Sequence, residues 1–103
     1  MQPTYNHDCF ELTSLASDRL GDPDGLSAML VAAAGAVGMS ALGPPVVRQG
    51  PAGIAVGMLC RDGHIIVHTT PDAATCFVDI VARVPADVGK GVEVIFRRLG
   101  VSG

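Results

Sequence analysis

The sequence predicts an α+β domain: a two-layer sandwich in which an antiparallel sheet carries two helices on one face. The main observation lies in residues 53–82, where three short apolar runs rich in β-branched side chains are separated by polar breaks at 61–63 and 71–72. Short runs bounded by turn-forming residues are typical of consecutive antiparallel strands. One more alternating segment and two segments with helical spacing give the order strand, helix, four strands, helix, which is typical of this architecture.

The first two elements in chain order are a strand and a helix. Residues 6–12 alternate along the chain and predict a strand whose two faces are Asp8, Phe10 and Leu12, and His7, Cys9 and Glu11. Pro23 suits the first turn of a helix, because its missing N–H needs no partner there. Residues 26–37 continue that helix, with an apolar stripe formed by Leu26, Met29, Leu30, Ala33 and Val37. Gly38 is suited to end it in the left-handed conformation.

An interrupted strand, a hairpin and a last helix follow. Residues 39–48 read as a strand broken by Gly43-Pro44-Pro45, and since proline cannot donate to a ladder, this strand is bulged or lies at an edge. Asp62-Gly63 predicts a tight hairpin turn in which the glycine takes a positive φ. Residues 85–99 predict the last helix, which Gly100 ends and whose buried stripe is Val88, Val92, Ile95, Phe96 and Leu99.

Size and composition limit the classes of function. The 103 residues make a single domain spanning 1–103, and 49% apolar against 17% charged residues predict that a second copy covers part of the surface as a homodimer. A formal charge of −3 without a basic run argues against a nucleic-acid partner, and no run approaches the roughly 20 apolar residues that span a membrane. Three widely spaced cysteines and no secretory signal favour free thiols in a cytoplasmic protein over disulfides or a metal site.

Two histidines are the first candidates for chemistry. His64 and His68 lie on the same face of a strand, with Ile66 between them, because side chains alternate. A histidine titrates near neutrality and can act as a general acid or base. The alternative is a pair of histidines that only make hydrogen bonds on a half-buried sheet face.

Two acidic residues and two cysteines can likewise have either a functional or a purely structural role. Asp79 interrupts an apolar strand, so it needs a partner or a pocket, and a polar sheet face is favoured over a pair in the core. Asp72 follows Pro71 and is either a ligand-binding carboxylate or a turn-former. Cys60 and Cys76 are favoured as small core residues over nucleophiles.

Two runs of the sequence carry a family resemblance. The first reads Asp62-Gly63-His64-Ile65-Ile66-Val67-His68-Thr69-Thr70-Pro71-Asp72, and the second reads Phe77-Val78-Asp79-Ile80-Val81-Ala82-Arg83. Together they resemble the small prokaryotic S-adenosylmethionine decarboxylases. Their segment reads roughly Glu-Ser-His-Leu-x-Ile-His-Thr-Trp-Pro-Glu, and later Ala-Val-Asp-Val-Phe-Thr-Cys-Gly. The Asp-Pro start of the first helix and the Gly-x-x-Gly before the third strand also look like the family. The resemblance covers most of the chain and implies the fold of that family.

The resemblance also implies what this chain has lost. Family members cut themselves at the Glu-Ser bond, and the serine becomes a pyruvoyl group that forms a Schiff base with the substrate amine and takes up electrons as CO2 leaves. Here the bond is Asp62-Gly63, and glycine has no hydroxyl for the acyl shift, so we expect no pyruvoyl group and no other cofactor. A serine that assists processing is Ala55, and the cysteine proton donor is Arg83. His68, which serves processing in the family, is kept.

The ligand-binding positions that the resemblance implies are altered as well. The family surrounds adenine with aromatic side chains, but Thr70 replaces a tryptophan and the phenylalanine expected near Gln49 is missing. The acid that holds the ribose is shortened to Asp72. The predicted ligand-binding set is Ile65, Thr70, Asp72, Asp79 and Arg83. Arg83 is alternatively a solvated strand end; facing the site, it would attract a carboxylate or phosphate.

Two hypotheses about function follow, and they differ on whether the protein is an enzyme. The first is a repurposed small-molecule site at a homodimer interface, which binds a metabolite related to S-adenosylmethionine. It would use His68, Asp72, His64 and Arg83 without a pyruvoyl group, and any reaction would be acid–base or positional catalysis. The second is a non-catalytic pseudoenzyme that binds or regulates an active decarboxylase or another protein.

Overall fold

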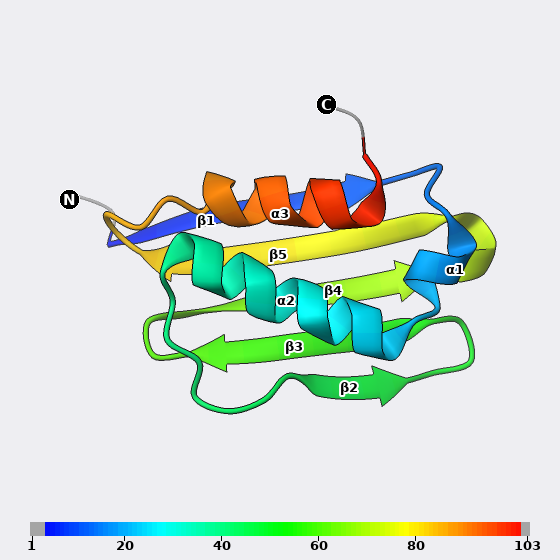
Figure 1. The fold of residues 1–103 in the computed structure, drawn as a ribbon, viewed down its shortest axis with the longest axis horizontal. Coiled ribbons are helices and arrows are strands. Elements are labelled where there is room, and N and C mark those ends of the chain that lie inside the picture. The colour runs from blue at the N-terminus through cyan, green and yellow to red at the C-terminus, as the bar shows by residue number, and fades with distance from the viewer. Residues whose placement is uncertain (1–3, 102–103) are drawn as a thin grey trace.

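The computed structural model describes residues 4–101 and confirms the predicted sandwich (Figure 1). Five strands form one antiparallel sheet in the order β1-β5-β4-β3-β2. The elements along the chain are β1 (Tyr5–Leu12), α1 (Ser17–Leu20), α2 (Pro23–Val37), β2 (Val46–Gln49), β3 (Ile54–Cys60), β4 (Gly63–Thr70), the 3₁₀ turn η1 (Pro71–Ala73), β5 (Thr75–Arg83) and α3 (Gly89–Leu99). Within these residues, no helix has the length and apolar character needed to cross a membrane.

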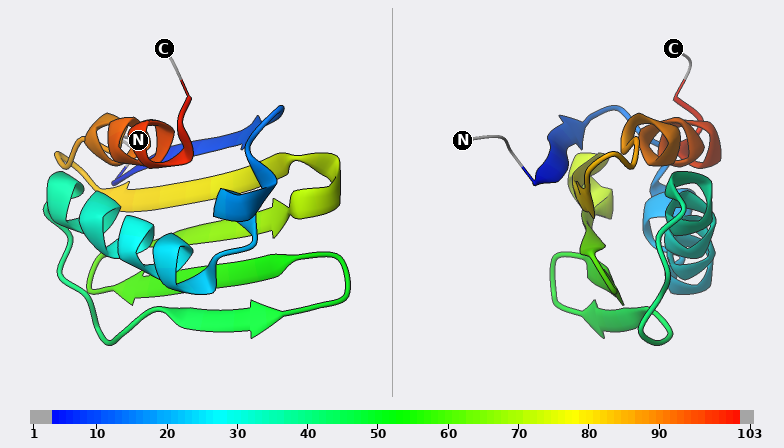
Figure 2. Two further views of the ribbon diagram at one scale, coloured as in Figure 1. Left: turned by 45° about the vertical axis from the view of Figure 1, so that its right-hand side comes forward. Right: turned by 90° about the vertical axis from the view of Figure 1, so that its left-hand side faces the viewer.

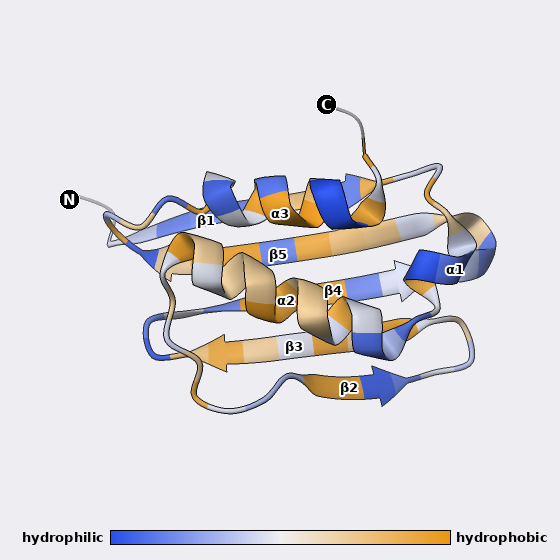
Figure 3. Cartoon of the chain, viewed as in Figure 1, coloured by the Kyte–Doolittle hydropathy of each residue, from blue (hydrophilic) through white to orange (hydrophobic). Residues whose placement is uncertain are grey.

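The helices cover only one of the two sheet faces (Figure 2). The core between the layers takes alternate residues of the three central strands, including Val56, Ile65, Val67, Val78 and Ile80, all 0% exposed. The predicted stripe of α2 is buried against them, and α3 shows alternating polar and apolar bands where one side faces the core (Figure 3). Because successive strand residues point to opposite faces, the same strands leave a second set of side chains on the other face.

The ends of α2 agree with prediction, whereas the start of α3 differs. The Asp22 carboxylate accepts the Gly25 N–H at 3.1 Å just before Pro23, and Gly38 ends α2 with φ 90°. The predicted start of the last helix at residue 85 is wrong, because α3 begins at Gly89. There the Asp87 carboxylate accepts the Gly89 N–H at 2.9 Å, which satisfies a donor that a helix start leaves free.

The hairpin between β3 and β4 forms at the predicted place, but the prediction for Gly63 is wrong. The two turn residues are Arg61 and Asp62, and Gly63 is already the first residue of β4, paired with Cys60 and Ala82. Its φ is not positive. A side chain here would clash with the backbone carbonyl oxygen of Val81, so close approach of β5, rather than turn geometry, is what requires glycine.

The remaining differences lie at the ends of the sheet. The predicted broken strand is confirmed as the short edge strand β2, preceded by a single bridge between Ala41 and Cys60. The short helix α1 had no sequence signal. It is held by Thr69, a buried residue whose hydroxyl donates to the Leu20 carbonyl at 2.8 Å.

Candidate functional site

The polar candidates lie on the sheet face that the helices leave bare, here called the open face. Strand alternation puts His64, Ile66 and His68 of β4 on this face, as predicted, while Ile65 and Val67 enter the core. Asp79 of β5 lies on the open face too, which confirms a polar sheet face rather than a core pair. The register then sets which of these side chains meet.

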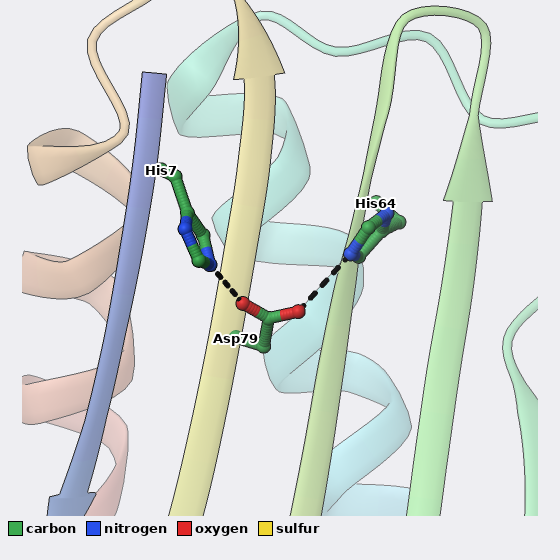
Figure 4. Close-up of polar contacts among 3 residues, drawn as sticks. All are labelled: His7, His64 and Asp79. Carbon is green, nitrogen blue, oxygen red and sulfur yellow. Dashed lines mark hydrogen bonds and ion pairs between the residues drawn. The ribbon is translucent and has the colours of Figure 1, made fainter. Parts of the chain in front are cut away.

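Asp79 lies between two histidines from the neighbouring strands (Figure 4). His7 Nε2 on β1 is 2.5 Å from Asp79 Oδ1, and His64 Nε2 on β4 is 3.1 Å from Oδ2. The Asp79 side chain is 26% exposed, so burial raises its pKa, but the hydrogen bonds and charges of His7 and His64 outweigh burial and hold that pKa below its ordinary value. This cluster is a carboxylate that keeps its charge, flanked by two imidazoles.

His68 stands apart from that cluster. Four residues of strand separate it from His64, which is about 13 Å at the usual rise per residue. His68 instead lines an open concavity of about 430 Å³ beside Gln49, Ala55 and Thr70, where β3 and β4 meet the loop after β2. The structure therefore groups His68 with Ala55 and Thr70, two of the altered positions, and separates it from His64.

A second concavity lies at the opposite end of β4. It measures about 320 Å³ and is lined by Tyr5, Arg61, Asp62, Gly63, His64 and Val81. Arg83 at the end of β5 is not simply a solvated strand end: its Nε donates to Asp62 at 3.3 Å and its Nη2 donates to the Tyr5 hydroxyl at 3.1 Å. These contacts hold the guanidinium beside the hairpin turn, about 5.0 Å from the centre of the Tyr5 ring.

A pyruvoyl group does not fit the residues present at this hairpin. Gly63 offers no hydroxyl, and the Val81 carbonyl occupies the space that a side chain at position 63 would enter. Restoring a serine would therefore require β4 and β5 to move apart locally. Ala55, in place of the assisting serine, pairs with His68 across β3 and β4 and adds no hydroxyl either.

Two predicted site residues do not face the polar groups. The prediction that Ile65 contacts a ligand is wrong for its side chain, because it is 0% exposed in the core beneath the helices. Asp72 lies exposed in η1 and does not line the concavity that contains His68. Cys60 and Cys76 are buried core residues, as predicted, and burial raises the pKa of the Cys76 thiol to about 12.

His7 and Cys9 are two polar residues of the open face that were not among the predicted site residues. The alternation of β1 already indicated that both side chains lie on one face of the sheet. The local sequence does not indicate which strand pairs with β1. The register pairs Cys9 directly with Asp79 and His7 with Val81. This pairing of the first strand with the last brings residues 72 positions apart into contact.

Comparisons with known proteins agree with this geometry. The sequence model of the family described as S-adenosylmethionine decarboxylase matches residues 6–102. Among solved structures, the crystal structure of the adenosylmethionine decarboxylase from Aquifex aeolicus VF5 superposes with a TM-score of 0.86 at 17% sequence identity, covering 97% of this chain and 83% of that one. A search of curated proteins by sequence gave no match.

Proposed function

Because the chain belongs to the S-adenosylmethionine decarboxylase family, we propose that it is a member that does not process itself and binds a small metabolite on the open face without a pyruvoyl group. The observation that carries this proposal is Gly63: it lacks the hydroxyl that the chemistry needs, and the Val81 carbonyl fills the space beside it. Any reaction then relies on the chain's own polar groups.

The binding site in this proposal is the concavity that contains His68. Its lining combines an imidazole and the Thr70 side chain with the Gln49 amide, and it is open enough for a ligand to enter. No phenylalanine, tyrosine or tryptophan lines it, and each missing stacking partner of that kind removes roughly 0.5–1.5 kcal/mol for a flat ring. A ligand smaller or more polar than an adenosyl group therefore suits the site, with His68 as the candidate acid or base.

Calorimetry with S-adenosylmethionine, its decarboxylated form and smaller amine and carboxylate metabolites tests this site. Two missing stacking partners predict adenosyl binding weakened by about ten- to a hundredfold, and Thr70→Trp should recover part of that loss. His68→Gln should abolish binding of the best ligand, while His64→Gln on the same strand should leave it intact. Micromolar binding of S-adenosylmethionine that survives Thr70→Ala but not His68→Ala would contradict the expected weak binding of adenosyl ligands, because the adenine would then be held without a stacking partner at position 70.

We also infer that two copies of the chain pack through the open face. Leu59 is 65% exposed and Phe77 40% exposed on that face, and burying such side chains in a twofold interface would stabilise a dimer. Light scattering should give the mass of a dimer, and Leu59→Glu should shift it to a monomer, whereas Val31→Glu on the outer side of α2 should not. A monomer at all concentrations would contradict this inference.

The same exposed residues favour the second candidate, a non-catalytic partner of an active decarboxylase. Such a partner would use Leu59 and Phe77 to contact a different chain of the same fold. Mixing the protein with an intact decarboxylase separates the candidates. A stable mixed assembly with a changed decarboxylation rate supports the regulator, and separate homodimers with unchanged activity rule it out.

A further inference from the structure

Three side chains with metal-ligating atoms lie together on β1 and β5, away from the concavity with His68. His7, Cys9 and Asp79 each offer one ligand atom, and these atoms all lie within 4.8 Å of one another. Strand pairing produces the cluster: Cys9 is directly opposite Asp79, and His7 is two residues before Cys9 on the same face. The widely spaced cysteines gave no sign of this arrangement in the sequence.

We propose that His7, Cys9 and Asp79 bind a zinc ion on the open face. A thiolate sulfur, an imidazole nitrogen and a carboxylate oxygen are the donors that Zn²⁺ prefers, whereas Mg²⁺ and Ca²⁺ take oxygen ligands. Bond lengths of about 2.0–2.3 Å around a tetrahedral zinc put its ligand atoms roughly 3.3–3.8 Å apart. The present spacing of up to 4.8 Å thus needs side-chain adjustments of about 1 Å.

Zinc would enter by replacing an existing contact. Nε2 of His7 and Oδ1 of Asp79 are 2.5 Å apart, so they would separate by about 1 Å to admit the ion between them. The Cys9 thiol and the Nε2 of His7 would each give up a proton to solvent, because the thiolate and an imidazole nitrogen without a hydrogen are the forms that bind metal. In the single chain Cys9 and His7 are both exposed, and they lie on β1 at the edge of the sheet, which gives the ion a path from solvent at that edge.

His64 has a positioning role in this site rather than a direct bond to the ion. Its Nε2 lies 3.1 Å from Asp79 Oδ2, so it holds the carboxylate by one oxygen and leaves Oδ1 for the metal. Three protein ligands leave a fourth tetrahedral position open to water or an exogenous ligand, as in zinc sites that carry out chemistry. The site shares no residue with the concavity around His68, so either assignment can fail without the other.

Titration of the metal-free protein with Zn²⁺ and Co²⁺ tests the site. We expect one ion per chain, and a cobalt spectrum containing a thiolate charge-transfer band that Cys9→Ser removes. Cys9→Ser, His7→Gln and Asp79→Asn should each weaken zinc binding by at least about tenfold, and His64→Gln by about ten- to a hundredfold while the sulfur band persists. His68→Gln is the matched histidine control on the same face and should bind like the parent chain.

Other outcomes would overturn the zinc site. A band that persists in Cys9→Ser would assign the sulfur to another cysteine, and equal weakening by His68→Gln and His7→Gln would show nonspecific binding to surface histidines. Absence of stoichiometric binding in a chain with intact circular dichroism would refute the site outright. Zinc should also slow alkylation of Cys9 in the parent chain, and an unchanged rate at saturating zinc would contradict ligation by Cys9.

Discussion

The two faces of the sheet differ in the burial and polarity of their side chains. On the covered face, Ile65, Val67 and Ile80 are fully buried under α2 and α3. On the open face, the residues between them include His64 and Asp79, which hydrogen bond across β4 and β5. Adjacent residues in the same strands therefore differ in their surroundings: one set is buried in the core and stabilises the fold, and the other leaves polar groups on the open face.

This difference would let the fold persist under the change of chemistry proposed above. Substitutions on the covered face alter core packing, so they lower the free energy of unfolding. Substitutions on the open face, such as those at Ala55 and Thr70, alter the site and leave the layer beneath intact. Gly63 differs from these positions, because a side chain there would clash with the backbone of β5, so a substitution would alter the site and also destabilise the sheet.

The largest expected difference between the faces comes from two neighbouring isoleucines of β4. Ile65→Ala on the covered face should lower the free energy of unfolding by about 2–5 kcal/mol, because it removes buried side-chain volume. Ile66→Ala, on the half-buried open face, should cost less than half of that in urea unfolding at low protein concentration. Equal losses would contradict the assignment of the two faces.

A smaller effect is expected from alanine at two glycines of the central strands. Gly63→Ala should destabilise the chain by about 1–3 kcal/mol, because the new methyl group meets the Val81 carbonyl. Gly57→Ala has its nearest neighbour, Ile66 Cγ1, at 3.8 Å and should be neutral or stabilising by about 0.5 kcal/mol. Thermal and urea unfolding measure both, and a neutral Gly63→Ala would show that β5 does not restrict position 63.

The smallest effect concerns the pH dependence of the metal-free protein. The pKa of Asp79 is held below its ordinary value, so its contribution to stability is present above the unfolded pKa of about 3.9 and is lost as pH falls through the lower folded pKa. Asp79→Asn should therefore lose less stability than the parent chain between pH 5 and pH 2. If Asp79→Asn loses as much stability as the parent chain between pH 5 and pH 2, the role given to Asp79 is contradicted.

Much of the fold could be predicted from local patterns. Alternation identified β1, and short β-branched runs between turn residues identified the three central strands. The apolar stripe with Pro23 and Gly38 identified α2. The start of α3 was not predictable from its apolar spacing, because Val88 belongs to the predicted stripe but precedes the first helical residue, Gly89. The role of Gly63 could not be predicted either, because it depends on a backbone carbonyl of β5.

The site was predicted only in part, for a related reason. Strand alternation correctly put His64, His68 and Asp79 on one face, since that depends on a period of two within each strand. It could not say that His7 meets Asp79, because that needs the pairing of the first and last strands. It also treated His64 and His68 as one set, although about four residues of strand keep them apart.

The most direct test of the proposed loss of self-processing is the intact mass of the purified protein. We expect one uncut polypeptide with the full mass of 10.5 kDa, because neither Gly63 nor its surroundings can support cleavage of the Asp62–Gly63 bond by the family's route. Prolonged incubation at neutral pH should not change that mass. Two fragments that divide between Asp62 and Gly63, the second with a blocked N-terminus, would contradict the account.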